Sequence, residues 1–127
     1  MKARATEKEV RTRLNDDGNL LEESHYEGGV RHGKETSWHS NDQKLTEYEF
    51  LNGKRHGKGI EWYANGQKHQ EIYFKNGERH GRYTSWWEEG NKKEEGVFEN
   101  GKCVGVYYWY LIDGSLWSSH DYSAHRG

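Results

Sequence analysis

The residues that most suggest chemistry are histidines, of which the chain has eight. Three of them, His32, His56 and His80, recur at equal intervals along the chain. If each interval adds two β-strands, which lie ~4.8 Å apart, then neighbouring histidines lie roughly 9.6 Å apart. Zinc ligands lie only ~2.0–2.1 Å from the metal, so these side chains do not converge on one ion. We therefore expect no metal and no cofactor, and predict that each ring hydrogen-bonds to backbone near its turn.

Carboxylates that could act as general acids or bases are repeated in the same way. A row of glutamates accompanies a row of arginines: Glu23, Glu47, Glu71 and Glu95, with Arg31, Arg55 and Arg79. A catalytic residue is needed once, whereas a residue copied in every unit belongs to the scaffold. We therefore interpret the two rows as a ladder of Glu–Arg contacts. Residues 118–121, Ser-Ser-His-Asp, hold the residue types of a catalytic triad, but triads assemble from distant segments. The sequence predicts a protein that is not an enzyme.

The elements that carry these residues follow a 24-residue repeat. The segment Asn52-Gly53-Lys54-Arg55-His56-Gly57 returns at residues 76–81 and, in altered form, at residues 28–33 and 100–105. Aromatic residues keep the same phase: Trp38, Trp62 and Trp86 follow Gly33, Gly57 and Gly81 by five positions, and Phe50, Phe74 and Phe98 precede the turns. Periods of this size indicate stacked supersecondary units. Asn-Gly between alternating runs indicates a β-hairpin.

The predicted fold is all-β: a single elongated antiparallel β-meander built from 24-residue β-hairpin repeats. Its strands are expected at residues 10–15, 20–27, 34–39, 44–51, 58–63, 68–75, 82–87, 92–99, 106–111 and 116–122. The repeat array therefore covers residues 10–122, about 4.5 units. Residues 1–9 are expected to be an N-terminal segment that is frayed or begins a short helix at Thr6, and residues 123–127 to be a tail.

Side chains two residues apart in a strand share a face of the sheet. We expect the tryptophan row and the phenylalanine row to lie on one face as a continuous aromatic core. The other face begins polar and becomes aromatic toward the C-terminus, with acidic neighbours: Tyr63, Tyr83, Trp87, Tyr107 and Trp109, with Glu88 and Glu89. Two interpretations stay open for this second cluster, burial beneath a curled sheet or N-terminal segment, and exposure as a partner-binding surface.

Composition and charge argue against several classes of protein. The net charge is −2 and both signs are interleaved, so the chain has no basic footprint for nucleic acid. No apolar run approaches the ~20 residues needed to cross a bilayer, and no apolar segment of a signal peptide follows the first residues. The single cysteine, Cys103, has no partner for an internal disulfide, and we expect an inert thiol. A cytoplasmic protein is expected.

The segment Asn-Gly-Lys-Arg-His-Gly followed by an aromatic residue, together with residues 26–33, resembles the MORN repeat. The longer unit with Trp-Tyr-Ala-Asn-Gly-Gln-Lys at 62–68 is similar to the MORN-repeat variant found in the YwqK-like antitoxin family of bacteria. The resemblance covers residues 10–122. It implies stacked hairpins that bind proteins, that sometimes dimerise, and that in eukaryotes are often linked to membranes and anionic lipids. Asp42, Gly28 and Val104 depart from the pattern, which suggests modified terminal units.

The predicted function is a non-enzymatic protein-binding module. Its most specific form is an antitoxin- or immunity-type inhibitor that neutralises a partner toxin or nuclease by direct binding, for which Glu88 and Glu89 would suit a basic partner. One alternative is a peripheral-membrane or scaffold adaptor that binds anionic lipid. The other is a self-assembling structural repeat protein, including a homodimer joined through sheet edges.

Overall fold

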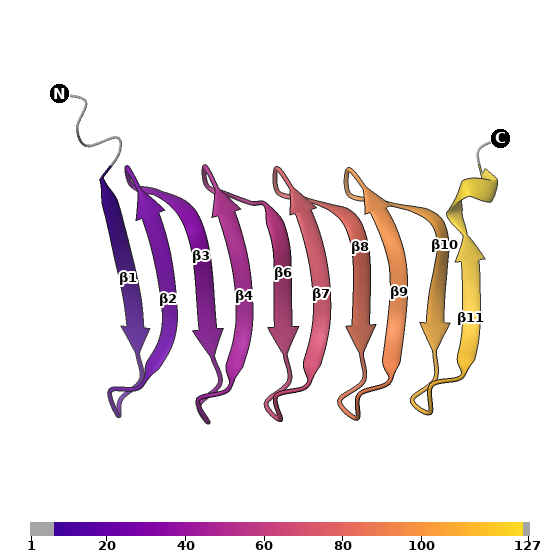
Figure 1. The fold of residues 1–127 in the computed structure, drawn as a ribbon, viewed down its shortest axis with the longest axis horizontal. Helices are drawn as coiled ribbons and strands as arrows, with labels where there is room; N and C mark the ends of the chain where they lie inside the picture. The colour runs from indigo at the N-terminus through magenta and orange to yellow at the C-terminus, as the bar shows by residue number, and fades with distance from the viewer. Residues whose placement is uncertain (1–6, 126–127) are drawn as a thin grey trace.

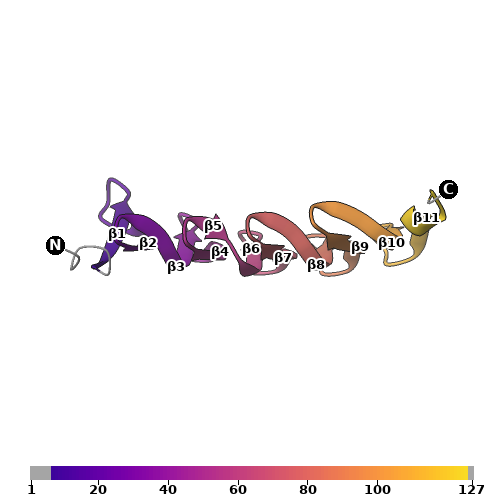
Figure 2. The ribbon, with the colours of Figure 1, turned by 90° about the horizontal axis from the view of Figure 1, so that it is seen from above.

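A computed structural model describes residues 7–125, which form one antiparallel sheet of 11 strands. The elements are β1 (Lys8–Leu14), β2 (Leu20–Glu27), β3 (Val30–Trp38), β4 (Lys44–Leu51), β5 (Lys54–Arg55), β6 (Gly57–Trp62), β7 (Lys68–Lys75), β8 (Glu78–Trp86), β9 (Lys92–Glu99), β10 (Lys102–Tyr110), β11 (Leu116–Asp121) and the 3-10 helix η2 (Tyr122–His125). Strands follow one another across the sheet in chain order, and the short β5 pairs with β4. Figures 1 and 2 show a single elongated layer with the chain ends at opposite ends. The predicted all-β meander is confirmed.

The ends of the array differ in detail from the prediction. Strand β1 begins at Lys8, so Lys8 and Glu9 are strand residues and not part of the N-terminal segment. The helix start suggested at Thr6 lies outside the described residues. At the other end, β11 stops at Asp121, and Tyr122 begins η2 instead of completing a strand.

Three of the turns at the top of Figure 1 are Asn-Gly turns, as predicted, but each is only two residues long, so the second strands begin four residues earlier than expected, at Lys54, Glu78 and Lys102. Asn52 and Gly53 both have positive φ, of 52° and 86°, and the same holds at residues 76–77 and 100–101. Positive φ at both central residues defines the type I′ turn, whose twist matches that of the strands. Asp42 also has positive φ, 69°, at a position where the other units have glycine. Asparagine and aspartate tolerate this conformation better than other side chains, so the repeat survives the replacement.

Hydrogen bonds between turns tie each unit to the next. At the top of the sheet, the amides of Gly53, Gly77 and Gly101 donate to the carbonyls of Arg31, Arg55 and Arg79 over 2.8, 2.9 and 2.9 Å. At the bottom, asparagine side chains play the same part: Asn41, Asn65 and Asn91 donate to the carbonyls of Ala64, Glu88 and Ile112 over 2.9, 3.2 and 3.1 Å. The repeat therefore fixes both edges of the layer as well as its strands.

The two aromatic rows lie on opposite faces of the sheet, and the expectation that they share one face is wrong. Residues paired across antiparallel strands share a face. Ile72 pairs with Tyr83, while the adjacent Glu71 pairs with Thr84, two residues before Trp86. We call one side the tyrosine face; its residues are Tyr48, Phe50, Ile72, Phe74, Tyr83, Phe98 and Tyr107. The opposite side is the tryptophan face; it carries Trp38, Trp62, Trp86 and the glutamate row.

The core lies on the tyrosine face. Its buried apolar residues are Tyr48, Ile72, Tyr83, Phe98 and Tyr107. A single layer has no second sheet to cover these rings, and glycines on neighbouring strands provide the room. A β-carbon added at Gly59 would lie 2.6 Å from Cδ1 of Tyr48, and one added at Gly96 would lie 2.3 Å from Cδ2 of Tyr107. Each of these two tyrosine rings therefore lies flat against a glycine opposite it, an arrangement known to stabilise glycine in strands.

Candidate interaction surface

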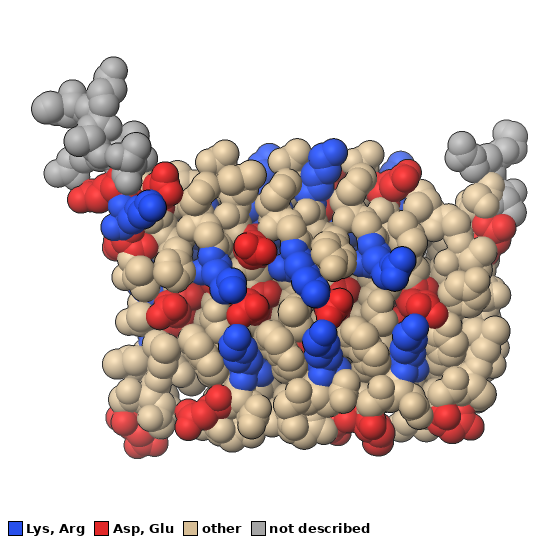
Figure 3. Space-filling model, viewed as in Figure 1, with Lys and Arg blue, Asp and Glu red and all other residues tan. Residues whose placement is uncertain are grey.

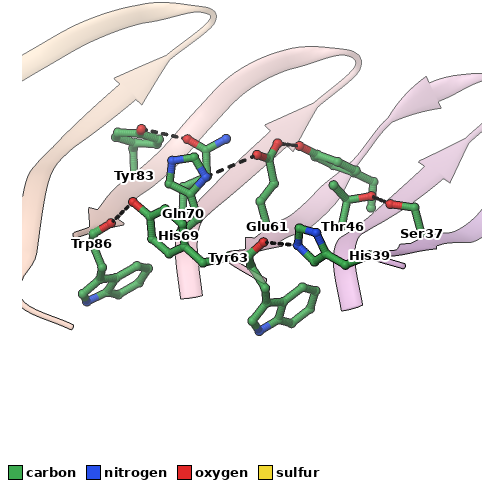
Figure 4. A network of polar contacts seen from close by, with 11 residues as sticks. Ser37, His39, Thr46, Glu61, Tyr63, His69, Gln70, Tyr83 and Trp86 are labelled. Atoms are coloured by element: carbon green, nitrogen blue, oxygen red, sulfur yellow. Dashed lines mark hydrogen bonds and ion pairs between the residues drawn. The ribbon is translucent and has the colours of Figure 1, made fainter. Parts of the chain in front are cut away.

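Three tyrosine hydroxyls of the tyrosine face reach polar groups on a neighbouring strand, in the network of Figure 4 and its continuation. Tyr48 donates to Glu61, Tyr83 donates to Gln70 over 2.9 Å, and Tyr107 donates to Glu94 over 2.6 Å. Burial, and then the neighbouring carboxylate, raises the pKa of the Tyr48 and Tyr107 phenols well above the usual range. The phenols are therefore neutral donors and the carboxylates are acceptors. This network holds the core together.

Toward the bottom of the tyrosine face a second ladder joins successive units. Nε2 of His39 lies 3.0 Å from the carbonyl of Trp62, and the hydroxyl of Tyr63 donates to the carbonyl of Trp86 over 2.7 Å. The Tyr63 ring also lies 4.5 Å from the ring of His69 (Figure 4). One unit later Trp87 takes the place of Tyr63, and its indole lies 4.8 Å from Nζ of Lys93. The ladder thus becomes more apolar toward the C-terminus.

The structure divides the predicted partner-binding residues into three groups. Tyr83 and Tyr107 are buried in the core, 8% and 7% exposed, and do not form an open surface. Tyr63, Trp87 and Trp109 are partly buried on the same face. Glu88 and Glu89 are exposed in the turn between β8 and β9. The accessible part of the predicted surface is therefore the lower half of the tyrosine face and its acidic turn.

The last hairpin exposes apolar side chains that were not among the predicted site residues. Leu111, Ile112, Leu116 and Trp117 are 45%, 52%, 56% and 68% exposed. The signal for Trp117 was present in the repeat, because the equivalent positions of the two preceding units hold Lys93 and His69. The two units before those hold Leu45 and Leu21 in this column, so the signal at Trp117 is a larger and more exposed apolar side chain, which marks a candidate contact site. We include Leu111, Ile112 and Trp117 in the candidate surface, whereas Leu116, at the repeat position of Lys92, lies on the tryptophan face.

The tryptophan face has a different character, because its charges neutralise one another. Figure 3 shows rows of basic and acidic side chains alternating across one face of the sheet. Nζ of Lys44 lies 2.9 Å from Glu47, and the same pair recurs as Lys68–Glu71 and Lys92–Glu95. The lysines also lie over indoles, at 5.7 Å for Lys44 over Trp62 and 5.9 Å for Lys68 over Trp86. The tryptophans are partly buried and are not the core that was predicted.

The predicted Glu–Arg ladder is therefore wrong. The arginine row lies on the tyrosine face, where its guanidinium groups cover aromatic rings. Arg55 lies 4.1 Å from the Tyr48 ring centroid and 5.5 Å from that of Phe74, and Arg79 lies 5.2 Å from that of Tyr83. A cation above a ring is attracted by its negative face. These arginines close the top of the core.

The rings of two of the three repeat histidines contact backbone near the turns, as predicted, but the prediction fails for His56, whose Nδ1 is buried without a hydrogen-bond partner. Nδ1 of His32 accepts from the amide of Asn52 over 3.5 Å, and Nδ1 of His80 accepts from the amide of Asn100 over 3.2 Å. Within residues 7–125 no group of three or more His, Cys, Asp or Glu side chains is placed to hold a metal ion. Burial raises the pKa of the Cys103 thiol, which disfavours the reactive thiolate.

Comparison with known families identifies the repeat. Residues 49–68 match the MORN repeat, and residues 79–100 match the MORN repeat variant. These two segments are thus similar to MORN-type repeats, and MORN repeats in general are non-enzymatic modules that bind proteins or membranes. No curated protein matches the chain. Among the described residues there is no helix long and apolar enough to cross a membrane.

Proposed function

We propose that the protein is a non-enzymatic binding module that acts on another protein through the lower half of its tyrosine face and its last hairpin. The observation that supports this most is the exposed apolar group of Leu111, Ile112 and Trp117. In a single-layer sheet such residues have no core to join. Trp and Tyr dominate the energetically important contacts of protein interfaces, and partly buried Tyr63, Trp87 and Trp109 are close by along the repeat.

The more specific form of this proposal is an antitoxin- or immunity-type inhibitor in the cytoplasm that covers a basic surface of a toxin or nuclease. The exposed pair Glu88 and Glu89, directly after Trp87, supports a basic partner because complementary charge speeds association. Binding to anionic lipid has less support. Lys44, Lys68 and Lys92 are paired with glutamates, and the arginine row lies over rings, so much of the basic charge is engaged within the sheet.

The test begins with affinity capture of the partner and continues with the two purified proteins. Trp87→Ala should weaken binding by about tenfold or more, as for a central interface tryptophan. Trp86→Ala is the matched control, because the neighbouring indole lies on the opposite face. Reversing Glu88 and Glu89 to lysine should slow association at low salt. If the partner is an enzyme, the variants that bind it more weakly should also inhibit it less. Full affinity in both the Trp87 and the Glu88/Glu89 variants would rule out this surface.

A further inference from the structure

The sheet is open at both ends. Strand β1 pairs with β2, strand β11 pairs with β10, and in the sheet formed by residues 7–125 these two strands are its outermost members (Figure 1). Every residue of β1 and of β11 is exposed. An uncovered edge strand is a template for pairing with another strand.

The two edges are different halves of the same repeat. Leu14 in β1 falls exactly one repeat before Trp38, so β1 is the second strand of a unit. Leu116 in β11 falls one repeat after Lys92, so β11 is the first strand of a unit. Inside the array every first strand is followed by a second strand. We propose that copies of this chain associate head to tail, with β11 of one copy pairing antiparallel with β1 of the next and continuing the sheet.

The register of this pairing follows from the units inside the array. In strands β9 and β10, Glu95 lies opposite Tyr108 and Val97 lies opposite Val104. One unit further along, the same register places Ser119 opposite Thr12 of the next copy. It also places Asp121 opposite Lys8 of the next copy. Opposite charges that face each other across strands stabilise the pair.

The two exposed leucines of the edges also meet in this register. Inside the array, a lysine of the first strand lies over a tryptophan of the second, as Lys68 does over Trp86. At the join the corresponding residues are Leu116 and Leu14 of the next copy, which are 56% and 55% exposed in the single chain. A charged residue on an aromatic ring is thus replaced by two apolar side chains, and these cover each other only when two copies meet.

Net charge favours this pairing over the symmetric pairing of two β1 strands. Strand β1 carries Lys8, Arg11 and Arg13 against Glu9, whereas β11 carries Asp121 as its charged residue. Pairing two copies of β1 would bring two basic strands together. A single strand pair buries less than the ~1,600 Å² of a standard stable interface, so we expect weak association that grows with protein concentration. Because the two surfaces differ, the contact repeats without closing and forms open chains.

Disulfide trapping tests the register directly. In a Cys103→Ser background, one chain carries Thr12→Cys and a second, of different mass through a tag, carries Ser119→Cys. Residues opposite each other lie ~4.5–5.5 Å apart at Cα, within the reach of a disulfide. The mixture should form the mixed disulfide under mild oxidation. Ser118→Cys is the matched control, because that side chain lies on the other face and should give only the background level with Thr12→Cys.

Charge exchange provides an independent measurement. Lys8→Asp and Asp121→Lys should each weaken self-association in sedimentation by up to about fivefold, the value expected for one cross-strand charge pair. The double variant should restore it, since the opposite charges again face each other. Dominant disulfides between two Ser119→Cys chains would show β11–β11 pairing and overturn the proposal. Trapping no greater than the Ser118 control, or a monomer at the highest concentrations, would also overturn it.

Discussion

The contact of Tyr107 with Gly96 predicts a large effect from one methyl group. In Gly96→Ala the new β-carbon would lie 2.3 Å from Cδ2 and 2.7 Å from Cε2 of Tyr107. The ring is buried, packs against Phe98 with centroids 6.4 Å apart, and donates its hydroxyl to Glu94 over 2.6 Å. The ring has to move to admit the methyl group, and it then loses part of these contacts.

The expected cost combines two terms. Overpacking a well-packed core costs ~1–3 kcal/mol. Weakening a hydrogen bond to a charged group costs up to ~1.5–3 kcal/mol. Replacing glycine by alanine in a strand offsets these terms by ~0.5–1 kcal/mol, because the unfolded chain loses freedom. We therefore expect Gly96→Ala to lower the free energy of unfolding by about 3 kcal/mol.

Urea denaturation followed by tryptophan fluorescence measures this loss, and a double-mutant cycle isolates its cause. In a Tyr107→Ala background, itself destabilised by ~3–5 kcal/mol, the added methyl group meets no ring. Gly96→Ala should then stabilise by ~0.5–1 kcal/mol, which gives a coupling of about 3.5–4 kcal/mol. Backbone strain does not contribute to the cost, because Gly96 is not among the glycines with positive φ. Equal costs of Gly96→Ala in the two backgrounds would refute the reasoning.

Two further predictions concern a hydrogen bond on the tryptophan face and an arginine that covers rings on the tyrosine face. The hydrogen bond to Glu95 raises the pKa of Tyr110 to about 12. An unfolded tyrosine ionises near ~10, so this stabilisation is complete below about pH 10 and is lost between about pH 10 and 12. Tyr110→Phe should make the alkaline fall in urea midpoint less steep, and an unchanged slope would contradict the assignment. Arg55→Ala removes a cation over Tyr48 and Phe74 and should cost about 1–2 kcal/mol in urea denaturation. Lys54→Ala, the exposed neighbour, should change stability by less than about 0.5 kcal/mol, and equal effects would contradict a specific role for Arg55.

The repeat and its hairpins could be predicted because the turn chemistry is local. Asn-Gly at 52–53 and 76–77 adopts positive φ at both residues, and few other dipeptides do so readily. The length of these turns also determines which residues of the two strands share a face, and the prediction of one aromatic face did not use it. A two-residue turn places Lys75 opposite Glu78, so even-numbered residues of the first strand share a face with odd-numbered residues of the second. Phe74 and Trp86, both even-numbered, therefore lie on opposite faces.

Burial was harder to predict because it depends on pairs of residues on different strands. Tyr107 and Trp109 share one face of strand β10, yet Trp109 is only partly buried while Tyr107 is buried. Gly96 on β9, against which the Tyr107 ring lies, makes the difference. Nothing in the local sequence of β10 reports a glycine on β9. Alternation gives the face of a side chain, and the strands on either side determine how much of it is covered.

In this single-layer sheet, polar side chains serve as hydrogen-bond partners of the core residues. Tyrosine can fill this core in place of phenylalanine, because its hydroxyl reaches an acceptor on a neighbouring strand, as Tyr107 reaches Glu94 and Tyr48 reaches Glu61. The glutamates that a search for acid–base chemistry would select are therefore acceptors within the fold. The most exposed of the large apolar side chains, Trp117, Leu116, Leu14 and Val10, lie on the two edge strands. Those residues can act only by contact, and for this reason the proposals for this protein concern binding.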